Sequence, residues 1–123
     1  MRDLIADDSE VLVERLTARL AEVPGIDVVG HAINVADAAR KIRKVRPDIV
    51  ILDICMPGGS GIDVLEGLNE DKLNPMVIVL SNCHHRQYRK KCLKIGARFY
   101  FDKSAEFHKV AEVLQGLLEA AAI

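Results

Sequence analysis

Residues 47–61 read PDIVILDICMPGGSG and hold the most informative pattern in the chain. The apolar run Ile49–Leu52 is too short for a stable helix, is rich in β-branched residues and is followed by turn-forming residues. Such a run is typical of a strand that is buried on both faces in the middle of a parallel sheet. It ends at Asp53, and ligands of open α/β sheets bind beyond the carboxyl ends of the strands. We therefore expect the chemistry of the protein at Asp53.

Strand-like and helix-like segments alternate along the rest of the chain. The expected strands are residues 4–6, 27–32, 49–52, 76–80 and 97–101. The expected helices follow Ser9 and Asn34, cover about 62–73 and 84–95, and run from Phe107 to the end. The connections are too short for anything but right-handed crossovers. This order predicts a flavodoxin-like α/β fold, with a doubly wound parallel sheet of five strands in the order 2-1-3-4-5 and five helices.

Composition limits the class of protein. The chain has 123 residues, half of them apolar, and a formal net charge of −1, so we expect one domain over residues 1–123. This charge favours neither nucleic acid nor an anionic membrane as a partner, and no apolar run approaches the ~20 residues that span a bilayer. Three cysteines without a CxxC motif argue against disulfides and structural zinc. We therefore expect a cytoplasmic protein that contacts no membrane and does not bind nucleic acid directly.

Reactive side chains follow four of the expected strands. Asp7 and Asp8 follow the first strand, Asp53 the third, Ser81 the fourth and Lys103 the fifth. In a doubly wound sheet these positions share one edge. Three carboxylates that lie close together repel one another, and a hard divalent cation such as Mg²⁺ stabilises such a cluster. A carboxylate nucleophile, a metal, a lysine and a hydroxyl suit phosphoryl transfer.

At these positions the sequence resembles the receiver domains of bacterial two-component response regulators. The matching features are the Asp7-Asp8 pair, the segment DICMP at 53–57, Gly61, Ser81 and Lys103. They occur in the order and at the spacing of that family and cover essentially the whole chain. The resemblance implies a signal-transduction phosphoprotein of a phosphorelay rather than an enzyme.

The resemblance also implies a role for each acidic residue. Asp53 is the expected phosphoacceptor and takes the phosphoryl group from a phosphohistidine of a sensor histidine kinase or phosphotransfer protein. Asp7 and Asp8 are expected to hold Mg²⁺, together with Asp53 and the backbone carbonyl of Cys55.

The remaining implied roles concern the response to phosphorylation. Ser81 and Lys103 are expected to contact the phosphoryl group, and Phe101 matches an aromatic switch position. The fourth helix, fifth strand and fifth helix are expected to present the signal to a downstream protein. The basic residues expected on the fourth helix of this face are Arg86, Arg89, Lys90, Lys91 and Lys94.

Several positions depart from the family pattern. Asn82 replaces the usual Ala or Gly after the hydroxyl residue, Phe101 replaces the commoner Tyr, and Ser104 replaces a frequent Pro. No output domain follows within the 123 residues, so we expect a regulator that works alone, like a chemotaxis-type regulator, rather than an excised receiver.

Two alternative functions stay open at the level of sequence. The first is a phosphorylation-independent pseudo-receiver scaffold, which Asn82 favours because its side chain narrows the approach to the site. The second is a phosphohydrolase with an aspartyl-phosphate intermediate. Haloacid-type phosphatases need a second acid two residues after the nucleophile, where this chain has Cys55.

Overall fold

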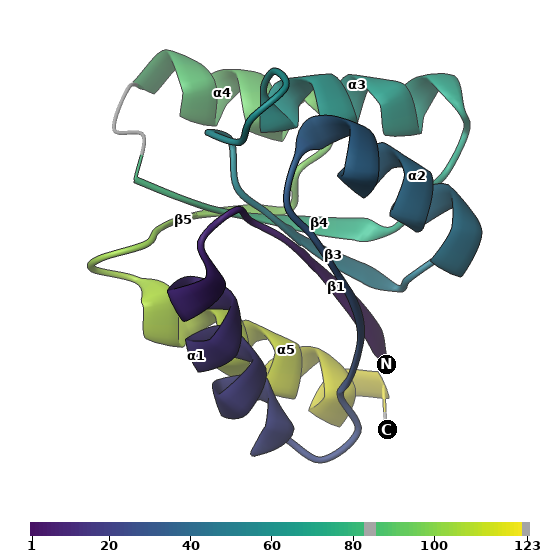
Figure 1. The fold of residues 1–123 in the computed structure, drawn as a ribbon. Coiled ribbons are helices and arrows are strands. Elements are labelled where there is room, and N and C mark those ends of the chain that lie inside the picture. The colour runs from purple at the N-terminus through teal and green to yellow at the C-terminus, as the bar shows by residue number, and fades with distance from the viewer. Residues whose placement is uncertain (83–85, 122–123) are drawn as a thin grey trace.

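The computed structural model describes residues 1–82 and 86–121, in which five strands alternate with five helices (Figure 1). The strands are β1 Arg2–Ala6, β2 Asp27–Ala32, β3 Ile49–Leu52, β4 Met76–Ser81 and β5 Phe99–Asp102. The helices are α1 Glu10–Ala21, α2 Val35–Val45, α3 Gly61–Glu70, α4 Arg86–Ile95 and α5 Phe107–Ala121. None of these helices combines the length and apolar character needed to cross a membrane. All strand pairs are parallel and the order is β2-β1-β3-β4-β5, which confirms the predicted sheet.

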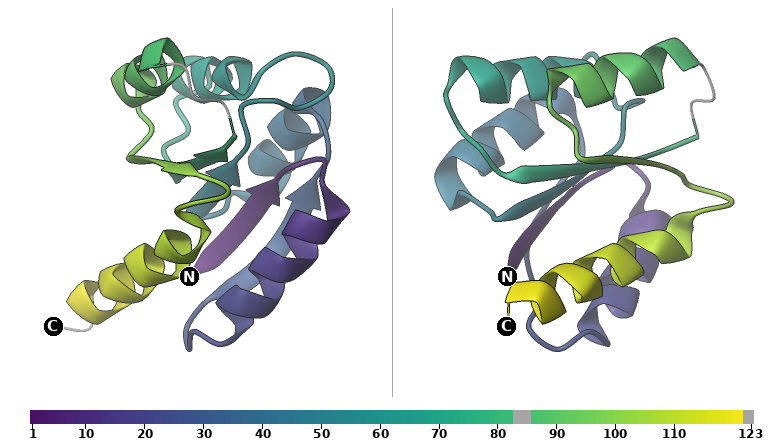
Figure 2. Two further views of the ribbon diagram at one scale, coloured as in Figure 1. Left: turned by 90° about the vertical axis from the view of Figure 1, so that its left-hand side faces the viewer. Right: turned by 180° about the vertical axis from the view of Figure 1, so that it is seen from behind.

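Helices cover both faces of the sheet. The helices α1 and α5 lie on one face, and α2, α3 and α4 lie on the other (Figures 1 and 2). Side chains of β3 alternate between the two layers: Val50 and Leu52 pack on the α2–α4 side, and Ile49 and Ile51 on the α1–α5 side. Every residue of β3 is buried, as its uninterrupted apolar run predicts.

Polar side chains fix the starts of three helices. The Ser9 hydroxyl accepts a hydrogen bond from the Leu12 amide, and the Asn34 side chain accepts one from the Asp37 amide. Both caps were predicted from the sequence, and each satisfies an amide that has no partner within its helix. Ser60 caps α3 in the same way, in a capping box with Asp63.

The structure corrects several element boundaries. Helix α3 ends at Glu70 and does not continue to Leu73, because Lys72 adopts the left-handed conformation with φ 56°. The amide of Leu73 then bonds back to the carbonyl of Leu68, which closes the helix end. Strand β1 begins at Arg2, two residues before the expected start. The expected start of the fourth helix at residue 84 lies outside the described residues, and α4 is described from Arg86.

The edge strand β2 contains a bulge. Its register with β1 moves from the pair Asp3–Val28 to the pair Leu4–Gly30, so Val29 is one residue more than β1 can pair with. A Cβ atom on Gly30 would lie 2.8 Å from Cδ1 of Leu4. A larger residue at this position would therefore force the buried Leu4 side chain to move.

Candidate functional site

The predicted reactive residues meet at the carboxyl ends of the strands. Asp7 follows β1, Asp53 follows β3, Ser81 ends β4 and Lys103 follows β5. Asp7, Asp53 and Ser81 are buried, at 2%, 4% and 1% exposure, and the Lys103 side chain is 14% exposed. Asp8, in contrast, is exposed. The sheet thus places charged groups at one edge, where only Asp8 is open to solvent among the three carboxylates.

Lys103 connects the two buried carboxylates. Its Nζ atom lies 2.7 Å from Oδ2 of Asp7 and 2.9 Å from Oδ2 of Asp53. Its backbone amide donates to the carbonyl of Ser81, which ties the loop after β5 to the end of β4. The sequence analysis placed Lys103 and Asp53 at the same edge of the sheet, and the structure brings the two side chains into contact. The second contact, with Asp7, was not predicted.

Backbone amides hold the other oxygen of each buried carboxylate. Oδ1 of Asp7 accepts a hydrogen bond from the Ser9 amide at 2.9 Å, and Oδ1 of Asp53 accepts one from the Cys55 amide at 3.1 Å. Each carboxylate therefore has one oxygen fixed by the chain that follows it and one oxygen bound to Lys103. This arrangement orients both groups before any ligand arrives.

The electrostatics of the site reflect burial and charge crowding. Burial raises the pKa of Asp53, the hydrogen bond and charge of Lys103 oppose this rise, and the nearby charge of Asp7 adds to it. Burial alone would lower the pKa of Lys103, but its contacts with Asp7 and Asp53 outweigh burial and raise that pKa. Lys103 thus stays cationic, and it cannot neutralise three carboxylates by itself.

The acidic cluster has the composition of a divalent cation site. Asp7, Asp8 and Asp53 each offer a carboxylate oxygen, and these three atoms lie within 4.8 Å of one another. Mg²⁺ binds carboxylate oxygens at about 2.1 Å in an octahedron and keeps several waters, so oxygens at this spacing can share one ion. The exposed side of Asp8 leaves room for water. These residues therefore fit Mg²⁺.

Gly61 is required by a close approach to the loop that carries Asp53. A Cβ atom at this position would lie 2.4 Å from the carbonyl oxygen of Asp53 and 3.0 Å from Cα of Ile54. The Gly61 amide also donates to the Ile54 carbonyl at 2.9 Å. The sequence analysis used this glycine only as part of a motif, and the structure supplies its physical reason.

Two of the unusual residues contact each other beside the site. The Ser104 hydroxyl donates to the side-chain oxygen of Asn82 at 3.3 Å and so connects the ends of β4 and β5. Asp102 orders the loop after β5, because its carboxylate accepts hydrogen bonds from the amides of Ser104 and Ala105. The loop is therefore ordered without the proline that the family pattern has there. Sequence reasoning considered Asn82 and Ser104 separately and missed their contact.

Phe101 lies on β5 close to the site. It is half-buried, and its ring stacks on Phe99 with a centroid distance of 5.6 Å and an interplanar angle of 20°. Both rings pack against the apolar layer between the sheet and the helices α1 and α5. Phe101 therefore has the contacts of a core residue, and a switching role for it stays a prediction.

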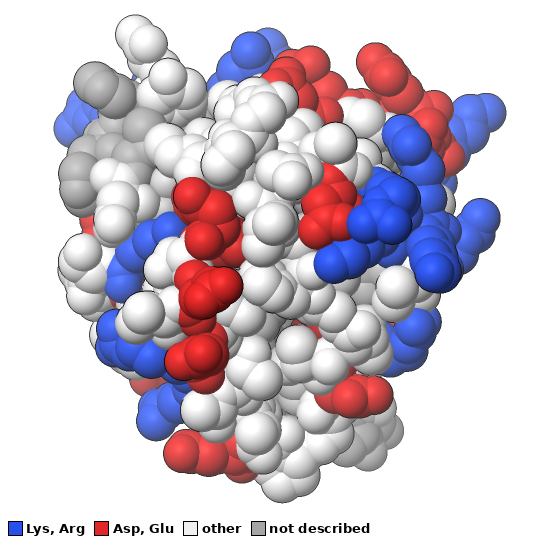
Figure 3. Space-filling view, viewed as in Figure 1, with Lys and Arg blue, Asp and Glu red and all other residues white. Residues whose placement is uncertain are grey.

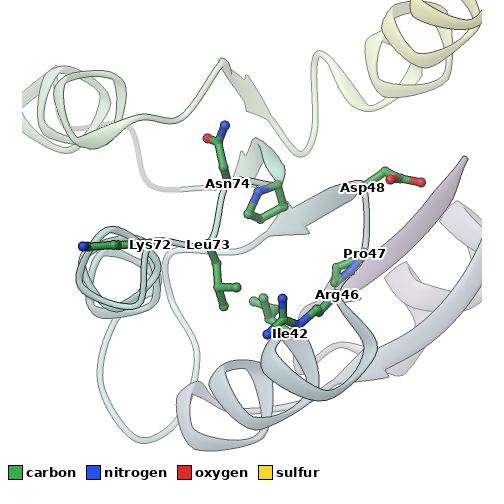
Figure 4. A pocket seen from close by; sticks show the side chains of 8 residues that line it. Ile42, Arg46, Pro47, Asp48, Lys72, Leu73 and Asn74 are labelled. Atoms are coloured by element: carbon green, nitrogen blue, oxygen red, sulfur yellow. The ribbon is translucent and has the colours of Figure 1, made fainter.

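Two hollows differ in their relation to the site. One of about 330 Å³ has Ile42, Arg46, Pro47 and Leu73 among its lining residues (Figure 4). Its lining residues precede β3 and β4, so it lies at the opposite end of the sheet from Asp53. Another of about 460 Å³ adjoins the acidic cluster, between Asp8, the loop after β3 and the N-terminal part of α4. The second hollow gives a small molecule access to the exposed side of the site.

Comparisons with known proteins agree with this geometry. A family model described as response regulator receiver domain matches residues 4–115. Response regulator GacA of Pseudomonas viridiflava is 29% identical over 117 residues, which cover 95% of this chain and 53% of GacA. The chain thus spans about half the length of the curated relatives it matches.

Two solved structures show the same similarity. The CheX-CheY-BeF3-Mg complex from Borrelia burgdorferi matches with a TM-score of 0.84 and 31% identity, over 96% of this chain and 89% of the matched chain. The response regulator domain of Thermotoga maritima CheB matches with a TM-score of 0.83 and 28% identity, over 100% and 97% of the two chains.

Proposed function

The chain belongs to the response regulator receiver domain family of two-component signalling, and from this premise we propose that it is a switch controlled by phosphorylation of Asp53. The observation that supports this most directly is the environment of Asp53. The carboxylate lies at the end of the central strand, one oxygen is oriented by the Cys55 amide, and the other contacts Lys103. Asp7 and Asp8 lie beside it with the spacing of a cation site.

The proposed reaction is phosphoryl transfer to the Asp53 carboxylate. An oxygen of Asp53 attacks the phosphorus of a phosphohistidine on a sensor histidine kinase or phosphotransfer protein. The new O–P bond forms while the P–N bond breaks, and the departing imidazole nitrogen takes a proton from solvent. The product is a mixed anhydride, an aspartyl phosphate, in the way that carboxylate nucleophiles form covalent intermediates elsewhere. The protein contributes mainly by positioning the nucleophile and neutralising charge.

Four ligands would hold Mg²⁺ at the site: the carboxylates of Asp7, Asp8 and Asp53 and the backbone carbonyl of Cys55. The ion supplies positive charge next to the phosphoryl oxygens. Lys103 already touches Oδ2 of Asp53 and carries a mobile point charge, so it can follow the phosphoryl group once that group is attached. The Ser81 hydroxyl ends the neighbouring strand and is the expected hydrogen-bond donor to the same oxygens.

The added charge provides the driving force for a switch. An aspartyl phosphate brings nearly two negative charges into a site where Lys103 is shared between Asp7 and Asp53. We expect Lys103 and Ser81 to turn toward the phosphate and Phe101 to repack. The downstream protein is expected on the surface of α4, β5 and α5. The basic side chains that α4 contributes to this proposal are Arg86, Arg89, Lys90, Lys91 and Lys94.

The experiment that tests the proposal is intact-protein mass spectrometry after incubation with a small phosphodonor, with Mg²⁺ or with EDTA. We expect one phosphoryl group to be added in Mg²⁺, none in EDTA, and none to the Asp53→Asn variant in either condition. Absence of an adduct in every condition, together with no response to beryllium fluoride, would refute the proposal in favour of a pseudo-receiver. Sustained release of phosphate from a small phosphomonoester would instead indicate the phosphohydrolase.

A further inference from the structure

Helix α4 carries a charge distribution that opposes its own stability. It has no acidic residue in its first turn, although the N-terminal end of a helix favours negative charge. Lys90 and Lys94 are four residues apart, a spacing at which like charges destabilise a helix. Only Cys92 is fully buried among its residues, so packing offers limited compensation. A negatively charged partner on α4 would relieve this repulsion.

The basic side chains of α4 leave the helix on two different sides. At 100° per residue, Lys90, Lys91 and Lys94 fall on the side facing α3, where Lys91 lies 3.9 Å from Glu66. Arg89 falls on the opposite side, and Arg86 lies between the two sides, about 40° from Lys90. The pKa of Glu106, at the start of α5, is lowered mainly by hydrogen bonds to Lys109 and the Asp102 backbone and also by the charge of Arg89. The three lysines therefore lie on the α3 side of α4, and Arg89 lies on the side of Glu106.

A groove lies between α3 and α4 beneath these lysines. It has a volume of about 620 Å³, and its lining residues are Glu66, Gln87, Lys90, Lys91, Lys94 and Ile95. Ile95 and the aliphatic parts of the lysines give it an apolar floor, while the ammonium groups remain at the rim. Among the described residues, Lys91 is the only one of the three lysines with an ion pair, and both partners of that pair are at least half exposed. The groove thus combines apolar surface with two lysines, Lys90 and Lys94, that have no ion pair among the described residues.

We propose that the α3–α4 groove binds an acidic segment of a partner protein. The lysines pair with its carboxylates, and apolar side chains of the segment pack on Ile95. A protein segment fits better than nucleic acid, because Glu66 lies inside the groove and the neighbouring α3 carries Asp63 and Glu70. These carboxylates repel a continuous phosphate backbone, whereas a peptide can place a neutral or basic residue opposite them. This surface is the α3 side of α4. It shares the three lysines with the proposed output face, but binding here does not require phosphorylation.

The test is fluorescence anisotropy with the labelled acidic peptide EELLEELLEE and the full chain. We expect the variant Lys90→Gln/Lys91→Gln/Lys94→Gln to bind it about tenfold more weakly, as expected for a few exposed ion pairs. A matched control is Arg40→Gln/Arg43→Gln/Lys44→Gln, which removes the same charge from α2, where basic side chains also gather (Figure 3). The control, and the variant Arg89→Gln, should bind as the natural chain does. Circular dichroism checks that every variant is folded.

Four outcomes would overturn the proposal. They are no binding of the peptide, equal weakening by the α2 control, equal weakening by the Arg89→Gln variant, and tighter lysine-dependent binding of oligouridylate than of the peptide. The last would assign the groove to nucleic acid. Repeating the measurement with the Asp53→Asn variant should give unchanged affinity. Failure of phosphorylation at Asp53 would therefore leave this result intact, and the two proposals can fail separately.

Discussion

Asp3 is a buried carboxylate without a partner, and its effect on stability can be measured. It lies in β1 with 0% exposure, and neither of its carboxylate oxygens has a hydrogen-bond partner among the described residues. Burial raises its pKa from the ordinary value of 3.8 to about 7. The α-ammonium group of Met1 opposes this rise, and the charges of Asp48 and Asp27 add to it. The folded chain therefore keeps a proton that the unfolded chain releases.

We predict that Asp3→Asn stabilises the protein in a strongly pH-dependent way. Below about pH 4 the carboxyl group is protonated in both states, so the variant and the natural chain should differ by less than about 1 kcal/mol. As the pH rises from 4 to 7, only the unfolded chain loses the proton, and the natural chain loses stability. Above pH 7 the natural chain has lost about 4 kcal/mol of unfolding free energy relative to pH 4. This follows from the difference between the folded and unfolded pKa of Asp3, at about 1.4 kcal/mol for each pKa unit.

The measurement is urea unfolding of both chains at pH 4, 6 and 8, followed by circular dichroism. The variant should be more stable by about 4 kcal/mol at pH 8, a large share of the 5–15 kcal/mol typical of a domain. Glu14→Gln is the matched control, because Glu14 is exposed and is not among the charges that act on Asp3, and it should change stability by less than about 0.5 kcal/mol. A stability difference that is the same at pH 4 and pH 8 would refute the reasoning. Asp3 and Asp7 lie at opposite ends of β1, so phosphorylation should be unaffected.

Three further predictions concern the site. Gly61→Ala should destabilise the protein by about 1–3 kcal/mol in urea unfolding and slow its phosphorylation, because the new Cβ collides with the Asp53 carbonyl; an unchanged unfolding midpoint would contradict this. Lys103→Gln should lower the free energy of unfolding by about 3 kcal/mol in EDTA, because two buried carboxylates lose their counter-charge. Mg²⁺ should restore part of the lost stability in thermal unfolding, and equal stability of the two chains in EDTA would count against the role of this lysine. Asn82→Ala removes the bond to Ser104 and should speed phosphorylation by a small donor in a mass-spectrometric time course, and an unchanged rate would show that this side chain does not limit access.

The fold was predictable because its signals are local and repeated. The β-branched run of β3, the caps Ser9 and Asn34, and the alternation of strands with helices each follow from short stretches of sequence. The wrong predictions concern the ends of helices and strands, where the conformation of a single residue decides where the element stops. Lys72 has no intrinsic preference for the left-handed conformation that ends α3, and only the packed structure selects it.

The site was predictable in its residues but not in its contacts. Strand order brings residues at the carboxyl ends together, so Asp7, Asp53 and Lys103 could be grouped from the sequence. The sharing of Lys103 between two carboxylates depends on distances that no spacing encodes. Asp3 was missed for a related reason: a polar residue near a strand end is usually exposed, and its burial follows only from the packing around it. Its position directly before the apolar residues Leu4–Ala6 of the same strand was the available signal.

The bulge in β2 has a consequence for how the molecule behaves at high concentration. An open sheet has two edge strands with unpaired backbone groups, and such edges can recruit a strand from another molecule. The additional residue Val29 interrupts the regular spacing of these groups along β2, and Asp27 places a charge at the start of the same edge. Both features disfavour the addition of a strand. The bulge therefore protects the β2 edge against aggregation by sheet extension.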